Sequence, residues 1–244
     1  VGSEMCIRDR SNLISGESYC ERVAELTRYA ADTVMNMADQ ITARDEEASA
    51  KVFEGLLLTG IAMSFTKTSR PGSGCEHIMA HYIECKELLE NKIPNYHGED
   101  VGVMTLIILK LYDKLLELPS VKCHSEKNDW GKIEKIYGPL AGDMKKLNEP
   151  KTITEDISLA RIEDNFTRIQ EMIRSVPSYE TLRNLMKRAG CKLTYKDIGK
   201  SESLIREALI YHVYMRRRLS LRRLMNMMEP VSYTHLRAHE TLRH

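Results

Sequence analysis

Three histidines have the residue type and the spacing of metal ligands: His77 and His81 in the stretch GCEHIMAHYIE, and His97 in NYHGEDVGV. Residues four apart share one face of a helix, so His77 and His81 point the same way. His97 follows a turn, and two adjacent helices could aim His77 and His97 at one point. Neutral imidazole binds zinc, but a catalytic zinc usually has three protein ligands and only two good ones are visible here. A helical histidine pair is more often a hydrogen-bonded structural pair, so spacing alone leaves both interpretations open.

The elements that position these histidines are predicted to be helices. The stretch from Cys75 to Leu89 is predicted to be a helix, because RPGSG breaks the chain before it and Pro94 forbids continuation after it. A second helix is predicted over about 99–118. Apolar residues recur three or four apart along most of the chain, and strand-like alternation is absent. The sequence therefore predicts an all-α fold for residues 11–229.

The other predicted helices cover about 17–41, 45–65, 130–137, 152–173, 178–190 and 201–228. The second of these is strongly apolar and is expected to run into the core. Thr152 and Glu155 have the spacing of a capping box, which predicts a helix start at Thr152. In the last helix the apolar residues share one stripe. We therefore expect most of the arginines of YMRRRLSLRR to face water rather than to bind nucleic acid or acidic lipid.

The two ends of the chain are complementary to each other at the level of codons. If Val1 to Asp9 are coded GTG GGC TCG GAG ATG TGT ATA AGA GAC, the reverse complement encodes VSYTHLRAH, which is residues 231–239. Such a long inverted repeat is not expected from chance or from protein selection. It resembles a translated sequencing adapter on both sides of an insert. We therefore expect residues 1–10 and 230–244 to be adapter-derived and the natural sequence to continue beyond both.

Composition argues against several classes of partner. Removing the four arginines and three acids of the two ends from the totals of 36 and 35 leaves 32 basic and 32 acidic side chains. This balance favours neither nucleic acid nor a membrane surface, and no apolar run reaches the ~20 residues of a membrane span. The five remaining cysteines are odd in number and scattered, without CxxC. They fit reduced thiols in a cytoplasmic protein better than a disulfide framework.

One long stretch around the histidines resembles the C-terminal helical domain of the sn-glycerol-1-phosphate dehydrogenase family: RDEEASAKVFEGLLLTGIAMSFTKTSRPGSGCEHIMAHYIE, followed by HGEDVGV. That family belongs with glycerol dehydrogenase, dehydroquinate synthase and the iron-containing alcohol dehydrogenases. The likeness runs from about Ser11 to about Leu219 and weakens after Leu118. The SRP, SG and EH residues of SRPGSGCEH are fairly specific to this branch, whereas the two histidine motifs are shared across the superfamily. The chain departs from the family at Gly72, where Ala is common, and at Cys75, where Ser is common.

The resemblance implies a role for two of the candidate residues, and position and side-chain chemistry suggest roles for the other two. His77 and His97 would be two of three zinc ligands. The third, an Asp, would precede this chain, as would a Rossmann-like nucleotide-binding domain. His81 would act in catalysis by orienting substrate or relaying a proton, with support of a metal ligand as the alternative. Arg70 would bind the substrate phosphate, because guanidinium grips phosphate in a bidentate way; a loop-anchoring salt bridge is the alternative.

The implied reaction is the reduction of dihydroxyacetone phosphate to sn-glycerol 1-phosphate by a nicotinamide cofactor, with the metal polarising the ketone oxygen. Zinc and NAD or NADP are the implied cofactors, a small-molecule phosphate is the expected partner, and a homo-oligomer is left open. The 244-residue chain alone is expected to be inactive. Two alternatives remain: another branch of the superfamily, glycerol dehydrogenase or dehydroquinate synthase, and a non-catalytic helical module with structural histidines.

Overall fold

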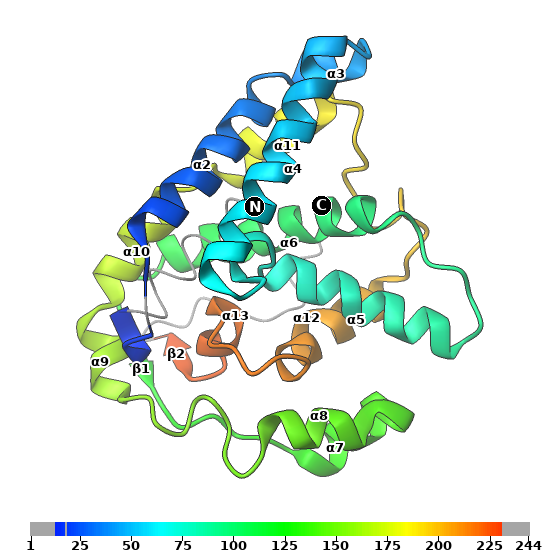
Figure 1. Cartoon of the computed structure of the whole chain (residues 1–244). Helices are drawn as coiled ribbons and strands as arrows, with labels where there is room; N and C mark the ends of the chain where they lie inside the picture. The colour runs from blue at the N-terminus through cyan, green and yellow to red at the C-terminus, as the bar shows by residue number, and fades with distance from the viewer. Residues whose placement is uncertain (1–12, 18, 231–244) are drawn as a thin grey trace.

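The computed structural model describes residues 13–17 and 19–230, and the all-α prediction is confirmed for them (Figure 1). The longer helices are α2 (Glu21–Met35), α4 (Glu46–Thr66), α5 (Cys75–Leu89) and α6 (His97–Leu116). The shorter helices are α3 (Ala38–Thr42), α7 (Trp130–Tyr137), α8 (Ala141–Asn148), α9 (Leu159–Asp164), α10 (Phe166–Arg174), α11 (Tyr179–Arg188), α12 (Glu202–Tyr211) and α13 (Leu221–Met225). Short 3-10 helices are η1 (Arg70–Gly72), η2 (Gly138–Leu140) and η3 (His212–Tyr214), and the strands are β1 (Val121–Cys123) and β2 (Met228–Pro230).

The core is built around α6, which packs against α5 and is also contacted by α10 and α11. Its sequence HGEDVGVMTLIILKLYDKLL is strongly apolar, and Met104, Ile108 and Leu115 have no exposed surface. From α5, Met79 and Ile83 are equally buried. Each such side chain stabilises the fold by roughly 1.5–3 kcal/mol when it leaves water. The two helices that carry the histidines therefore belong to the core.

Helix α4 is as apolar as a core helix, yet much of it is exposed. Its main neighbour is α2, and η1 contacts it as well. Phe53, Leu57, Ile61 and Phe65 are spaced four apart and are 46–75% exposed. The expectation that this helix runs into the core is therefore wrong for the part of the chain that the structure describes, because no described element covers that face.

Of the described helices, α4 alone is long and apolar enough, by length and composition, to cross a membrane. Its charge-free part, residues 55–66, would extend about 18 Å at 1.5 Å per residue. The hydrocarbon core of a bilayer is about 30 Å thick. Lys51 and Glu54 form an ion pair at 2.7 Å just before the charge-free part, so a span would have to include both charges.

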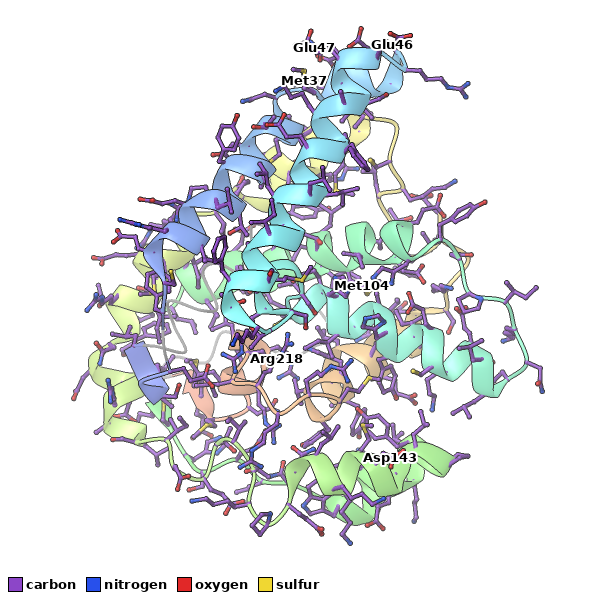
Figure 2. The ribbon with its side chains drawn as sticks, in the orientation of Figure 1. Met37, Glu46, Glu47, Met104, Asp143 and Arg218 are labelled. Carbon is purple, nitrogen blue, oxygen red and sulfur yellow. The ribbon has the colours of Figure 1, made fainter. Side chains whose placement is uncertain are left out.

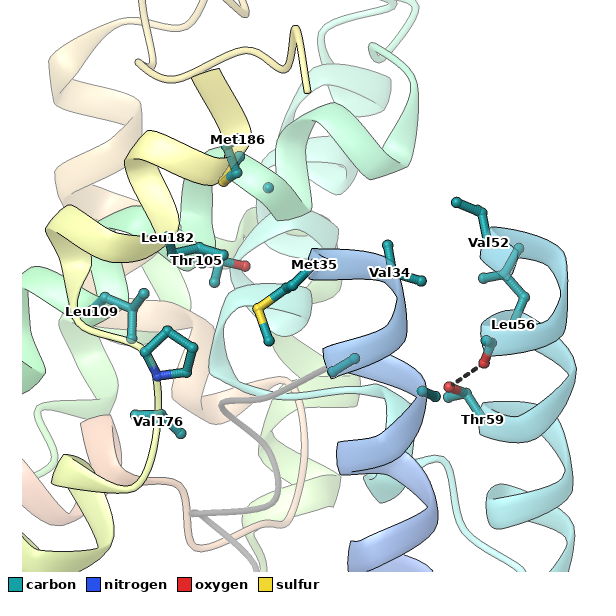
Figure 3. A pocket seen from close by; sticks show the side chains of 15 residues that line it. Val34, Met35, Val52, Leu56, Thr59, Thr105, Leu109, Val176, Leu182 and Met186 are labelled. Carbon is teal, nitrogen blue, oxygen red and sulfur yellow. Dashed lines mark hydrogen bonds between the residues drawn. The ribbon is translucent and has the colours of Figure 1, made fainter. Parts of the chain in front are cut away.

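A groove separates the α2–α4 pair from α6 and α11 (Figure 3). Its volume is about 310 Å³, and its lining is mostly apolar, with Met35, Leu56 and Met186 contributed by three different helices. The hydroxyl of Thr59 at its edge is already engaged, because it donates to the carbonyl of Gly55 at 2.8 Å. The groove therefore offers apolar surface and few free hydrogen-bonding groups.

The helix predicted to begin at Thr152 begins later, as α9. Glu155 does accept a hydrogen bond from the backbone N–H of Thr152 at 2.7 Å, but the residues between them form turns. Ser158 caps α9, and Asn165 separates α9 from α10. The predicted start is wrong because the Glu155 side chain satisfies the backbone of a turn, which competes locally with a helix.

The helix predicted over 201–228 is also interrupted, and forms α12, η3 and α13. Ser201 caps α12 and Ser220 caps α13, each by accepting a backbone N–H. Likewise, the helix predicted over 17–41 is divided into α2 and α3. Two serine caps in one stretch mark two helix starts, which apolar periodicity alone does not reveal.

The arginines of YMRRRLSLRR lie in different environments. Arg216 and Arg217 are exposed, as expected. Arg223 is fully buried; its guanidinium lies 3.2 Å from a carboxylate oxygen of Glu126 and donates to the side-chain oxygen of Asn148 at 3.0 Å. The expectation that most of these arginines face water therefore does not hold for Arg223, because the chain breaks before α13 and turns that residue inwards.

Two short strands were not expected from the sequence. β1 and β2 pair antiparallel, with Val121 opposite Pro230. Three-residue strands from distant parts of the chain leave no periodic signal, because their pairing is entirely non-local. The predicted adapter-derived ends, residues 1–10 and 230–244, lie outside the described residues except for Pro230.

Candidate metal centre

Helix α5 begins at a fixed place because the turn before it is held from two sides. On one side η1 lies against α4: a Cβ added at Gly72 would come within 2.9 Å of the Cγ2 of Thr59. On the other side Arg218 donates to the carbonyl of Ser73 at 3.1 Å and to the hydroxyl of Ser69 at 2.8 Å. Figure 2 shows Arg218 beneath the C-terminal end of α4. These contacts fix the direction in which the first turn of α5 leaves the loop.

Helix α6 begins at His97 itself. The loop before it is tied to the C-terminal half of the chain, because the side chain of Asn95 donates to the carbonyl of Ile198 at 2.6 Å. Glu99 and Asp100 fall in the first turn, where acidic side chains interact favourably with the helix dipole. His97 is therefore placed at the helix start by contacts on both sides of it.

The three histidines come together in space. Nε2 of His97 lies 2.9 Å from Nε2 of His77. The three ring centroids are 4.5–5.0 Å apart, and one ring nitrogen from each histidine lies within 4.8 Å of the others. We call His77, His81 and His97 the histidine cluster. The structure thus brings together the two predicted ligands and the predicted catalytic residue.

Glu84 holds two rings of the histidine cluster and was not among the residues predicted from the sequence. Its carboxylate oxygens bond Nδ1 of His97 and Nδ1 of His81, the second at 3.0 Å. Because an ionised carboxylate only accepts, both Nδ1 atoms carry the proton. Nε2 of His97 then accepts the hydrogen bond that His77 donates from its Nε2, and Nε2 of His81 keeps its lone pair. The signal was present, since Glu84 lies three residues after His81 and seven after His77, on the same helical face.

The protonation of the cluster suits a ligand role. Burial, together with the neighbouring His97 and His81, lowers the pKa of His77 from its ordinary 6.5 to about 4. At neutral pH the imidazole of His77 is therefore uncharged. Burial also raises the pKa of Glu84, but the hydrogen bonds with His97 and His81 outweigh burial, so the net shift is downward. A carboxylate bonded to the second ring nitrogen is the common support of metal-bound histidine.

The donor atoms have nearly the spacing that zinc needs. Two nitrogen ligands at 2.0–2.1 Å from a tetrahedral zinc lie about 3.3 Å apart. The Nε2 atoms of His77 and His97 are 2.9 Å apart, so a small separation would admit the ion. The side chains of His81 and His97 are 39% and 40% exposed, which leaves the cluster open to solvent. The residues present therefore fit a zinc ion and leave access for a further ligand.

Arg70, which was predicted to bind a substrate phosphate, is engaged in an ion pair. Its guanidinium donates to both carboxylate oxygens of Glu17, at 3.0 Å for one of them. The pair ties the turn before α5 to the segment that precedes α2. The loop-anchoring alternative thus describes Arg70 in this structure, and a phosphate would have to share the guanidinium with Glu17 or displace it.

Several known proteins that share one name are similar to this chain, although no family model matches it. A Bacillus licheniformis protein named glycerol-1-phosphate dehydrogenase (NAD(P)+) is 29% identical over 216 residues, covering 88% of this chain and 44% of that protein. A Geobacillus stearothermophilus protein of the same name is 28% identical over 196 residues, covering 80% and 43%. One from Thermococcus kodakarensis is 41% identical over 99 residues, covering 41% and 27%. The chain spans less than half the length of these relatives.

Proposed function

We propose that this chain, which is similar to glycerol-1-phosphate dehydrogenases over most of its length, is the metal- and substrate-binding part of such an enzyme. The reaction assigned to the whole enzyme is the reduction of dihydroxyacetone phosphate to sn-glycerol 1-phosphate with NADH or NADPH. One observation carries the proposal: Nε2 atoms of His77 and His97 converge to 2.9 Å from two different helices. Because this chain covers 44% of its Bacillus relative, we assign the activity to a longer protein.

The histidine cluster provides the metal ligands in this proposal. His77 and His97 present Nε2, and Glu84 fixes the orientation of the His97 ring. A zinc ion held there would polarise the ketone oxygen and stabilise the negative charge that develops as the nicotinamide supplies hydride. The family resemblance assigns the third ligand to an Asp outside this chain. His81 then exchanges a proton with the substrate at Nε2, since Glu84 occupies its Nδ1.

The remaining assignments concern the substrate and its setting. Arg70 binds the substrate phosphate, which displaces the carboxylate of Glu17. In the structure both terminal nitrogens of the Arg70 guanidinium donate to that carboxylate. A cytoplasmic location belongs to the same proposal, because the scattered cysteines, without CxxC, suit a reducing compartment. The expected partner is a small phosphorylated molecule, and neither nucleic acid nor a membrane is assigned.

Zinc titration of the 244-residue chain tests the metal site. We expect the wild type to bind one equivalent of Zn²⁺ in isothermal titration at neutral pH. His77→Ala and His97→Ala should each weaken binding by roughly 100-fold or more, because each removes a donor atom. His124→Ala is the control, since His124 is engaged with the carbonyl of Ser125 outside the cluster. Equal zinc binding by all four proteins, or none by the wild type, would refute the site.

A further inference from the structure

A buried lysine lies close to the histidine cluster. Nζ of Lys200 is 2.6 Å from both carboxylate oxygens of Glu87 and 3.6 Å from Oδ2 of Asp100. The side chains of Lys200, Glu87 and Asp100 are 2%, 12% and 0% exposed. We call these three residues the Lys200 triad. Charged side chains are rarely buried this completely, because their removal from water is costly unless they are paired.

The Lys200 triad joins the two helices that carry the histidines. Glu87 follows Glu84 by three residues on α5, and Asp100 follows His97 by three residues on α6. Three residues are nearly one turn, so each acid lies on the same side of its helix as the site residue before it. The helices are therefore linked at two neighbouring levels, by the bond between Glu84 and His97 at one and by Lys200 at the other.

The backbone of Lys200 is itself well fixed. Its N–H donates to the carbonyl of Tyr195 at 2.9 Å. Gly199 before it has a φ of 67°, a left-handed conformation that glycine adopts without strain. Ser201 after it caps α12. The ammonium group therefore enters between α5 and α6 from a fixed point on a third segment, and can act as a spacer between them.

Without the ammonium group, two carboxylates would face each other where little water can reach. The ion pair with Lys200 is the larger of the interactions that stabilise the charge of Asp100, and the side chain of Asn95 adds a smaller one. Burial raises the pKa of Asp100, and Lys200 opposes that rise. Loss of the lysine would therefore force Asp100 to take up a proton or α6 to move away from α5.

We propose that Lys200 is a positioning residue for the histidine cluster: by neutralising Glu87 and Asp100 together, it fixes the spacing of α5 and α6 at which His77 and His97 meet. The inference rests on the proposed function in so far as it concerns zinc. Removing the lysine changes both the local charge and the spacing of the helices, and these two changes have opposite effects on zinc affinity. A nearby cation repels Zn²⁺, so loss of charge alone would tighten zinc binding. Loss of the helix spacing weakens it.

The test compares Lys200→Met with Lys86→Met in the full 244-residue chain. Lys86 is a matched control because it is an ion-paired lysine on α5, bonded to Glu207 at 2.9 Å and outside the Lys200 triad. Zinc affinity is measured by competition with a chromophoric chelator, at a temperature where circular dichroism shows each variant folded. We expect Lys200→Met to weaken zinc affinity by roughly tenfold or more and Lys86→Met to change it by less than about twofold.

Unchanged or tighter zinc binding by Lys200→Met would overturn the proposal. If that variant does not fold, the triple variant Lys200→Met, Glu87→Gln and Asp100→Asn decides, because it leaves no charge buried and unpaired. We expect the triple variant to fold and to bind zinc within about threefold of the wild type, since nothing then drives α5 and α6 apart. A folded triple variant with tenfold weaker binding would show that charge neutralisation is not the cause.

A zinc-free measurement separates this inference from the proposed function. In protein labelled with ¹⁵N-histidine, NMR detects the ring N–H protons that His81 and His97 donate to Glu84. We expect Lys200→Met to shift or broaden the His97 signal and Lys86→Met to leave it unchanged. A wild type that binds no zinc but responds in this way would refute the metal site and retain the positioning role. Unchanged ring signals in Lys200→Met would overturn the positioning role whatever the zinc result.

Discussion

Glu84 determines which ring nitrogens of the histidine cluster are available to a ligand. It occupies Nδ1 of both His81 and His97, so Nε2 is the nitrogen of each ring that can bind a metal, and in this structure Nε2 of His97 is bonded to Nε2 of His77. The spacing of the histidines predicted that His77 and His97 could meet, because helical periodicity fixes which residues share a face. The same spacing could have indicated Glu84, but a carboxylate on a helix is usually a solvated side chain, and only the structure shows it turned towards the rings.

Replacing Glu84 with Gln keeps the size of the side chain and removes its charge. An amide has one oxygen to accept with, so only one of the two rings stays anchored. We expect zinc affinity to fall by about 10–100-fold, as is usual when the support of a metal-bound histidine is lost. Chelator competition measures the change, with Glu90→Gln as the control because Glu90 pairs with Lys92 at the surface. Wild-type zinc affinity in Glu84→Gln would contradict this assignment.

His212 shows the opposite use of a histidine, as a neutral core residue. Burial lowers its pKa to about 3, although its ring Nδ1 is bonded to the carbonyl of Ala208 at 2.8 Å. In the unfolded chain the pKa of His212 is near its ordinary 6.5, so the unfolded chain takes up a proton there first as the pH falls. The contribution of neutral His212 to the free energy of unfolding is therefore complete above about pH 6.5. It is lost progressively towards pH 3, by about 2 kcal/mol between pH 7 and pH 5.

Substitution of His212 should remove that part of the acid sensitivity. We expect the zinc-free His212→Gln variant to lose about 2 kcal/mol less stability than the wild type between pH 7 and pH 5. Urea unfolding at pH 7 and pH 5 measures the change in the free energy of unfolding. When the change in the variant is subtracted from that in the wild type, the contributions of the other histidines cancel. The same pH dependence in both proteins would show that His212 is protonated as easily in the folded as in the unfolded chain.

Among the helices, glycine and proline breaks predict the ends well, whereas capping residues and the neighbours of a helix are predicted poorly. The predicted limits of α5, Cys75 and Leu89, are the observed ones, because Gly and Pro punctuate the chain on both sides of it. Helix α4 was predicted at the right place but assigned to the core, since apolar composition does not say which neighbours are present. Helix α12 was predicted too long, because serine caps at Ser201 and Ser220 resemble ordinary polar residues in a periodic pattern.

The junction of η1 with α4 leaves little room for a side chain at Gly72. A Cβ there would lie 2.9 Å from Cγ2 of Thr59. We expect Gly72→Ala to lower the free energy of unfolding by about 1–3 kcal/mol through overpacking. Thr59→Ser removes the clashing methyl group and keeps the hydroxyl that bonds Gly55, so it should relieve most of that cost.

A double-mutant cycle by urea denaturation measures the coupling between residues 59 and 72. If the methyl group of Thr59 causes the clash, Gly72→Ala lowers the free energy of unfolding less in the Thr59→Ser background than in the wild type. Purely additive effects would mean that the turn relaxes without help from Thr59. The fluorescence of Trp130, on α7 and outside both elements, can report the transition.

For the whole molecule, the all-α class can be predicted from the sequence, whereas the contacts between distant segments cannot. The Lys200 triad and the pairing of β1 with β2 each join residues about a hundred positions apart, and no local pattern predicts them. The chain matches its Bacillus relative over 44% of that protein. The exposed face of α4 and the groove beside it are apolar surfaces that the described residues leave uncovered.

The 244-residue chain on its own should not oxidise NADH or NADPH, even with zinc and dihydroxyacetone phosphate present. The reason is that the family resemblance assigns the nucleotide-binding domain and the Asp ligand to sequence outside this chain. Absorbance of the reduced nicotinamide measures the rate, and the His77→Ala variant gives the background. Zinc-dependent turnover above that background would mean that the chain contains a complete active site.

The central claim is that His77 and His97 share one metal ion. X-ray diffraction from crystals of this chain grown with zinc, recorded at the zinc absorption edge, locates the ion directly. We expect one anomalous peak at the histidine cluster, about 2.0–2.1 Å from Nε2 of both rings, with Nδ1 of His97 still bonded to Glu84. A map without a peak there, or a zinc ion bound to only one of the two rings, would contradict it.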